Sequence, residues 1–171
     1  FASIAQPTTS TPDTYTLTVT NTSNGCKATD EVIVSQDTTP PVANAGVDKL
    51  LTCTNPTLPI GTTAVSGNSY SWSPATGLIG PTTAQPSVNT PGTYTLTVTN
   101  TANGCISTDV VNITQDIIPP VANAGADKTL TCSNPTLQIG TAAASGNTYA
   151  WVPASGVTTS TIAQPNAIAP G

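Results

Sequence analysis

Apolar and polar residues alternate along two nearly identical stretches of the chain, TYTLTVTN at 14–21 and again at 93–100. In the second stretch Tyr94, Leu96 and Val98 alternate with threonines, so an extended segment would have one apolar face and one threonine face. A helix cannot use a period of two. The alternation resumes at Val111 and Ile113 after the sequence TANG, which predicts a β-hairpin over 93–114.

Further short strands are predicted upstream of this hairpin. Residues 49–53 are expected to form a first strand, and Leu58 and Ile60 a second, which Pro59 marks as an edge or a bulge. Tyr70 and Trp72 lie on another, between the turn-like sequences SGN and SPATG. About seven short strands separated by turns predict an all-β protein, built as a small β-sandwich.

The whole chain repeats itself with an offset of 79 positions, which relates Tyr15 to Tyr94 and Trp72 to Trp151. The same offset relates the cysteines and prolines pairwise: Cys26 to Cys105, Cys53 to Cys132 and Pro40 to Pro119. We therefore expect three segments: the C-terminal part of one repeat at 1–39, a complete repeat at 40–118 and the N-terminal part of the next at 119–171. We expect the chain to be a stretch of a longer tandem array, and the lack of a signal peptide at its start then carries no information about export.

Composition narrows the functional classes. The chain has three Lys plus Arg, eight Asp plus Glu, no His and a net charge of −5, which disfavours nucleic acid and anionic membrane surfaces as partners. No apolar run reaches the roughly 18 residues of a membrane span, so we expect no membrane insertion. Without histidine, and with few scattered carboxylates, we expect neither catalysis nor a bound cofactor.

Aromatic and aliphatic residues at corresponding places are expected to form the core. One large aromatic on the third strand and a tyrosine at the start of the penultimate one suit the packing of a small sandwich. An alternative role for the tryptophan is a stacking platform for a glycan. The predicted core residues are Tyr15, Trp72, Tyr94, Leu96, Val98, Tyr149 and Trp151.

Several motifs together resemble a known group of repeats. The sequences PPVANAGVDKLLTC, YSW, PATGL and TPGTYTLTVTNTANGC are similar to the PKD-like and immunoglobulin-like repeats of very large secreted surface proteins of Bacteroidota, among them gliding-associated adhesins. The resemblance covers essentially all of each repeat. It implies an extracellular tandem array at the cell surface, exported by a type IX route through a signal outside this sequence.

Four cysteines in a chain of this composition favour disulfides in an oxidising compartment over metal binding, because there is no CxxC spacing and no histidine. Two connectivities remain open. A Cys53–Cys105 pair would staple the complete repeat, leaving Cys26 and Cys132 to pair outside this sequence or between chains; we prefer it because small repeats usually staple themselves. If the first strand runs parallel to the last, the bond would instead cross a junction between repeats or join neighbouring chains.

The junctions carry acidic residues beside a Pro-Pro pair. A calcium ion held there would stiffen the joint, but Ca²⁺ requires six to eight oxygens and each junction supplies two carboxylates, with Asp30 or Asp109 as a third. Solvated turn residues are the simpler interpretation. The weak calcium candidates are Asp37, Asp48, Asp116 and Asp127.

Other side chains are candidates for covalent modification. Lys49 and Lys128 are considered for isopeptide crosslinks, although no acidic catalyst is evident near them in the sequence. Asn21 and Asn112 match the N-glycan acceptor pattern, and the sequence DTT at 37–39 resembles an O-glycosylation motif of Bacteroidota.

Three functions follow from these features. The first is a structural segment of an extracellular fibre or stalk that projects an adhesive or cell-contacting domain, with neighbouring repeats and laterally associated copies as partners. The second is a binding module whose 73–83 loop recognises a glycan, prey or host surface. The third is a self-assembling subunit whose incomplete front half is completed by another copy's back half, as in strand exchange.

Overall fold

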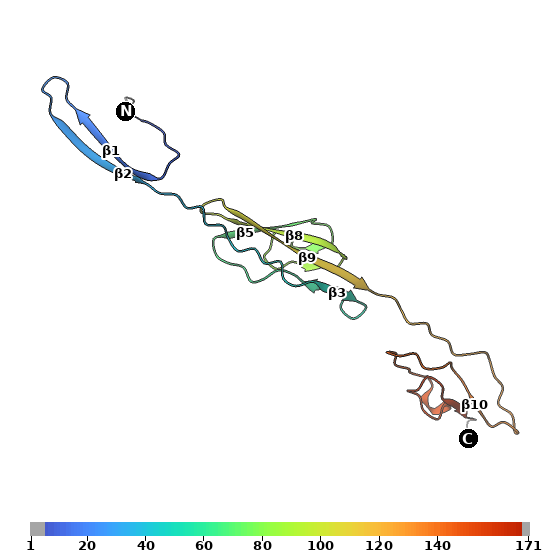
Figure 1. Ribbon diagram of the computed structural model, residues 1–171. Coiled ribbons are helices and arrows are strands. Elements are labelled where there is room, and N and C mark those ends of the chain that lie inside the picture. Colours follow the sequence, from blue (N-terminus) through green and yellow to red (C-terminus); the bar gives the residue numbers. More distant parts are fainter. Residues whose placement is uncertain (1–5, 169–171) are drawn as a thin grey trace. The chain divides into compact units, whose positions relative to one another are not determined.

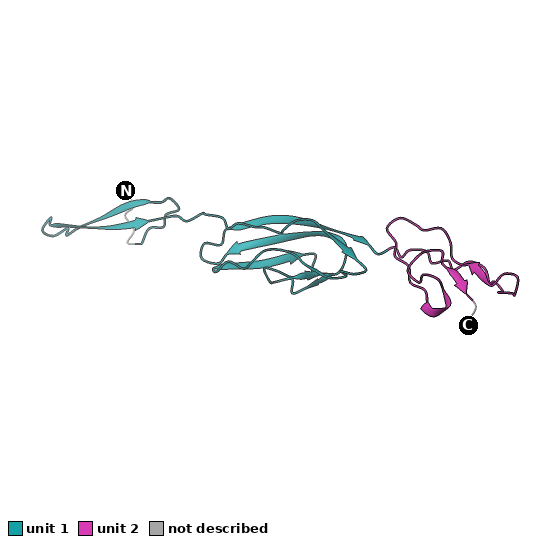
Figure 2. Ribbon diagram, turned by 90° about the horizontal axis from the view of Figure 1, so that it is seen from below, with its two compact units in different colours: residues 1–117 teal, residues 118–171 magenta. Residues whose placement is uncertain are grey.

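The computed structural model describes residues 6–168 and divides the chain into two compact units, Phe1–Ile117 and Ile118–Gly171 (Figure 2). Residues 1–5 and 169–171 lie outside the described residues. They belong to the predicted segments 1–39 and 119–171. Almost all regular structure within 6–168 is β-strand; the exception is one short 3₁₀ turn, Ala154–Gly156. The described residues therefore include no helix with the length and apolar character of a membrane span.

Residues 40–117 form a β-sandwich-like fold of seven strands in two sheets (Figure 1). The larger sheet has the order β3-β9-β8-β5 and the smaller sheet the order β4-β7-β6. The bounds are β3 Lys49–Thr52, β4 Leu58–Pro59, β5 Asn68–Ser73, β6 Leu78–Ile79, β7 Ser87–Val88, β8 Gly92–Asn100 and β9 Ile106–Asp116. The first strand, β3, runs parallel to the last, β9, whereas all other pairs are antiparallel.

The core of this sandwich lies between its two sheets. The alternation of β8 places Tyr94, Leu96 and Val98 inward and leaves the threonines between them partly exposed. Trp72 of β5 is only 3% exposed, and its indole N–H donates to the Thr83 carbonyl at 3.0 Å. The core cluster is Ala45, Leu51, Ile60, Trp72, Val88, Tyr94, Leu96, Val98, Val111 and Ile113.

The N-terminal hairpin consists of β1 Asp13–Thr20 and β2 Lys27–Val34 and pairs with no other described strand. Its register, Tyr15 opposite Val32, is that of Tyr94 opposite Val111 in the β8–β9 hairpin. The turns match as well: Asn21 N–H donates to the Cys26 carbonyl at 2.8 Å, and Asn100 N–H to the Cys105 carbonyl at 2.9 Å. The two hairpins therefore share register and turn, although only β8–β9 packs against a second sheet.

Residues 119–168, called the half-sandwich below, form a counterpart of the smaller sheet only. Strands β10 Thr136–Gln138 and β11 Asn166–Ile168 pair antiparallel, and Val157 bridges to Ala167 as β6 pairs with β7 in the sandwich. The segments corresponding to β3 and β5 are not strands here. In the sandwich those two strands pair only with β9 and β8, for which the half-sandwich has no counterpart.

Candidate functional site

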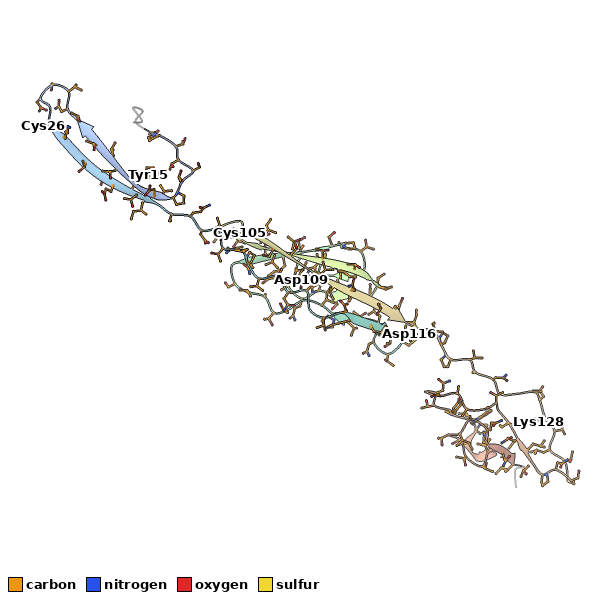
Figure 3. All side chains as sticks on the ribbon, viewed as in Figure 1. Tyr15, Cys26, Cys105, Asp109, Asp116 and Lys128 are labelled. Carbon is orange, nitrogen blue, oxygen red and sulfur yellow. The ribbon has the colours of Figure 1, made fainter. Side chains whose placement is uncertain are left out.

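Cys53 and Cys105 lie at opposite ends of the sandwich, and all four cysteines are free in the structure. Cys53 follows β3, whose last residue, Thr52, is in register with Asp116 at the end of β9. Cys105 immediately precedes β9, so β9 separates the two; Figure 3 shows Cys105 and Asp116 at its two ends. Eleven residues at about 3.4 Å each put these ends more than about 30 Å apart, whereas a disulfide needs Cα atoms within about 7 Å.

The preferred Cys53–Cys105 pair is therefore wrong, because the parallel pairing of β3 with β9 carries the two thiols to opposite poles. Cys105 marks the pole where the chain enters the sandwich: the Asn103 side chain donates to the Thr39 carbonyl at 3.0 Å. Cys53 marks the pole where the chain leaves it, beside Asp116. Cys26 lies at the turn of the N-terminal hairpin, and Cys26, Cys53 and Cys132 are exposed.

The carboxylates proposed for calcium cap separate backbone groups rather than gather at one point. Asp48 accepts a hydrogen bond from Asn112 N–H at 2.8 Å, and Asp109 accepts one from Ala45 N–H at 2.8 Å. Hydrogen bonds from the backbone and hydroxyl of Thr39, and then from Asn103, lower the pKa of Asp37 below its usual value. Within residues 6–168 no three acidic or cysteine side chains come together as a metal site.

The lysines considered for isopeptide bonds tie strands together instead. The Lys49 ammonium donates to the Pro59 carbonyl, and Lys128 donates to the Gln138 carbonyl at 2.6 Å. Each lysine thus bonds the carbonyl of the last residue of β4 or of its counterpart β10 Thr136–Gln138. The same contact at both places indicates a structural role for these lysines.

The modification candidates are exposed but already hydrogen-bonded. Asn21 accepts bonds from the backbone and hydroxyl of Ser23 at 3.0 and 2.7 Å, in the hairpin turn. Asn112 lies on β9 and accepts a bond from the Thr93 hydroxyl at 2.8 Å. Thr39 N–H donates to Asp37 at 3.0 Å, within the DTT motif.

The 73–83 loop, the candidate for glycan recognition, is anchored to the sandwich core. Trp72 N–H donates to the Pro81 carbonyl at 2.9 Å, and Thr83 N–H donates to the Gly80 carbonyl at 3.0 Å. The ring of Trp72 is buried, so it offers no face to a sugar. The tryptophan belongs to the core rather than to a binding platform.

Apolar side chains are exposed on one face of the N-terminal hairpin. Leu17 is 60% exposed, whereas its counterpart Leu96 is 2% exposed. Val19 and Val32 are similarly uncovered, while Val98 and Val111 are buried. The predicted core residue Tyr15 is only half-buried for the same reason, because no second sheet covers the hairpin.

In the half-sandwich, the side chains that correspond to the core of the sandwich line two open hollows. A hollow of about 590 Å³ is lined in part by Tyr149, Trp151 and Ala163, and a second of about 280 Å³ by Leu130, Ile139 and Trp151. The counterparts Leu51, Ile60 and Trp72 are in the core of the sandwich. Tyr149 and Trp151, predicted as core, are therefore only half-buried. The 79-residue offset had already predicted that residues 1–39 hold only the C-terminal part of a repeat and residues 119–171 only the N-terminal part.

No protein-family model matches the chain, and no curated protein matches it.

The buried phenol of Tyr94 leads to a pH-dependence prediction. Burial raises the pKa of Tyr94, and its hydroxyl donates to the Thr90 carbonyl at 3.0 Å. The neutral phenol is thus favoured in the folded state, so its stabilisation is complete below the unfolded pKa of about 10 and is lost as pH rises through the higher folded value. We expect the urea midpoint of the sandwich to fall above about pH 10.

Tyr94→Phe is expected to lower stability by about 1 kcal/mol at neutral pH, through the lost hydrogen bond, and to reduce this alkaline loss. Tyr15→Phe, at the half-buried counterpart, is the matched control and should keep the alkaline loss. The same alkaline slope in both variants would contradict the assignment to Tyr94.

Proposed function

We propose that the chain is a structural segment of an extracellular fibre or stalk, built from tandem immunoglobulin-like or PKD-like sandwich repeats of 79 residues. The observation that carries this proposal is the correspondence of local geometry at the 79-residue offset: the two hairpins share every paired position from Asp13–Val34 to Thr20–Lys27. Domain boundaries at 39/40 and 118/119 are part of the same proposal.

The strand arrangement supports the immunoglobulin-like type. One sheet places the first, last, penultimate and third strands side by side, and the other holds the remaining three, as in sandwiches of that class. The tryptophan lies on the third strand, β5, and Tyr94 on β8 bonds the backbone four residues upstream, like the tyrosine corner of such domains. Tyr15 makes the same bond to the Thr11 carbonyl, at 2.9 Å.

A role as a spacer is supported by the positions at which the chain enters and leaves the sandwich. Entry at the Cys105 pole and exit at the Cys53 pole add the length of the sandwich to the array with each repeat. Pro-Pro at the start of each predicted repeat stiffens the connection. We propose that the fibre lies at a bacterial cell surface after type IX export, that it presents adhesive or cell-contact functions, and that it has no catalytic role.

The proposal predicts that antibodies raised against residues 40–117 label intact, unpermeabilised cells along projecting filaments in electron microscopy. The purified chain should give no signal on a glycan array, because Trp72 is buried and Trp151 is half-buried, so neither tryptophan presents an open ring face to a sugar. Label found only after permeabilisation would contradict the surface assignment. A reproducible glycan signal would favour a binding module over a stalk.

A further inference from the structure

We propose that Asn103 is a clamp that fixes the joint between two repeats, because it holds the incoming linker in line with the last strand of the sandwich. The linker is residues 37–39, which lie immediately before Pro40. This clamp deepens the proposed spacer role and rests on the tandem array of that proposal. It gives the joint a specific contact in addition to the stiffness of Pro-Pro.

The incoming chain runs beside β9 in one constant register. Four pairs of residues, each 64 positions apart, join the two segments through hydrogen bonds or strand pairing. The pairs are Thr39–Asn103, Ala45–Asp109, Asp48–Asn112 and, at the start of the parallel β3–β9 ladder, Lys49–Ile113. Because this separation is constant from the linker to β3, the incoming chain follows the direction of β9 before β3 begins. The bond to Asn103 is the first of these contacts along the chain.

The Asn103 amide bonds the sandwich with one atom and the linker with the other. Its oxygen accepts a hydrogen bond from Cys105 N–H at 2.9 Å, which ties the side chain to the β8–β9 turn. Its nitrogen donates to the Thr39 carbonyl at 3.0 Å. Hydrogen bonds from the backbone and hydroxyl of Thr39, and then from the Asn103 side chain, lower the pKa of Asp37. One side chain therefore contacts both the first and the last residue of the linker.

The clamp acts at the place where a stiff joint needs it. In the complete repeat the last strand, β9, extends to Asp116, which is the counterpart of Asp37 at the 79-residue offset. After Thr39 the chain enters Pro40 and Pro41, whose rings fix φ and restrict the residue before them to extended conformations. In an array the strand of one repeat would thus end where the clamp of the next begins. Bending of the joint would have to break the bonds of Asn103.

Asparagine suits this position because the clamp needs an acceptor and a donor on one side chain. Aspartate would still accept the hydrogen bond from Cys105 N–H, but it could not donate to the Thr39 carbonyl. Its charge would also lie close to the Asp37 carboxylate, which the amide now contacts. Asn103→Asp therefore separates the clamp from the turn that carries it.

NMR relaxation of the backbone nitrogens in the full chain measures the order of the linker. We expect order parameters of about 0.85 for residues 37–39 in the unmodified chain, as for rigid backbone, and below about 0.6 in Asn103→Asp. The turn at 100–105 should keep its order in both chains, because Cys105 N–H keeps its acceptor.

Asn24→Asp is the matched control, with the same change of charge in the turn of the N-terminal hairpin. The Asn24 side chain accepts a hydrogen bond from Cys26 N–H at 3.0 Å, as Asn103 does from Cys105. This substitution should leave the order of the linker unchanged. Equal loosening in Asn24→Asp and Asn103→Asp would contradict a specific clamp.

A second pair of variants approaches the clamp from the linker. Asp37→Ala removes the carboxylate that Asn103 and Thr39 contact, and it should lower the order of residues 38–39. Gln36→Ala, at the neighbouring exposed residue, should not. Both side chains are exposed, so neither change should unfold the sandwich, and this pair decides the question if Asn103→Asp does not fold.

The pKa of Asp37, followed by NMR titration, distinguishes the clamp from a general loss of stability. In Asn103→Asp this pKa should rise, because the carboxylate loses a donor and gains a carboxylate neighbour. In Asn24→Asp the pKa of Asp37 should stay as it is in the unmodified chain.

A linker that is mobile in the unmodified chain, or equally ordered in Asn103→Asp, would overturn the clamp and leave the surface assignment of the fibre standing. An ordered linker that loosens in Asn103→Asp, with antibody label found only after permeabilisation, would support the clamp and reject that surface assignment.

Discussion

Replacing Leu96 with aspartate is expected to unfold the sandwich. The side chain is 2% exposed between the two sheets, and no cation lies in the core cluster to pair with a carboxylate. An unpaired buried charge costs several kcal/mol, comparable with the whole stability of a domain this small. Urea unfolding followed by the fluorescence of Trp72 measures the loss.

Leu17→Asp is the matched control, because the same residue type in the same register is 60% exposed on the N-terminal hairpin. This substitution should change the free energy of unfolding of the sandwich by less than about 0.5 kcal/mol. Equal losses in both variants would contradict the assignment of the core to residues 40–117.

Gly61→Ala is expected to be the second most damaging change. A Cβ at Gly61 would lie 2.1 Å from the Ala84 carbonyl oxygen and 2.9 Å from the Trp72 ring, and the backbone φ is +79°. Neither obstacle is a flexible chain end, so the smaller sheet must move away from Trp72. We expect a loss of about 3 kcal/mol or more, the sum of left-handed backbone strain and overpacking.

Gly67→Ala separates these two causes. Its φ of +81° is nearly the same, but nothing lies within 4 Å of its Cβ position. Gly67→Ala should lower the free energy of unfolding, measured by urea unfolding, only by the left-handed backbone strain, about 1 to 2 kcal/mol. If Gly61→Ala lowered the free energy of unfolding no more than Gly67→Ala does, the close packing of Gly61 against Ala84 would be contradicted.

Much of the local structure followed from the sequence. The period-two alternation predicted a hairpin over 93–114, and the structure has it from Gly92 to Asp116. Residues 49–53, Pro59 and the Tyr70–Trp72 stretch were predicted on short strands, and β3, β4 and β5 are found there. These predictions succeeded because side-chain alternation and turn residues are properties of neighbouring positions.

The pairing of distant strands could not be obtained in this way. The preferred Cys53–Cys105 disulfide failed because its geometry depends on the direction of β3 beside β9, two strands more than fifty residues apart. The acidic residues of the junction were interpreted as solvated turn residues or weak calcium candidates, yet Asp48 and Asp109 bond backbone groups that only the folded sandwich brings near. Long-range pairing leaves no local signal.

The sequence by itself determined that the chain is built of β-strands and where its hairpins turn, because alternation and turn chemistry act over a few residues. Only the tertiary structure decided which of the repeated residues are covered. Leu17 and Leu96 share the same local sequence and register, but β8 lies against a second sheet and β1 does not. Burial therefore depends on what packs across a face, which neighbouring residues in the sequence do not specify.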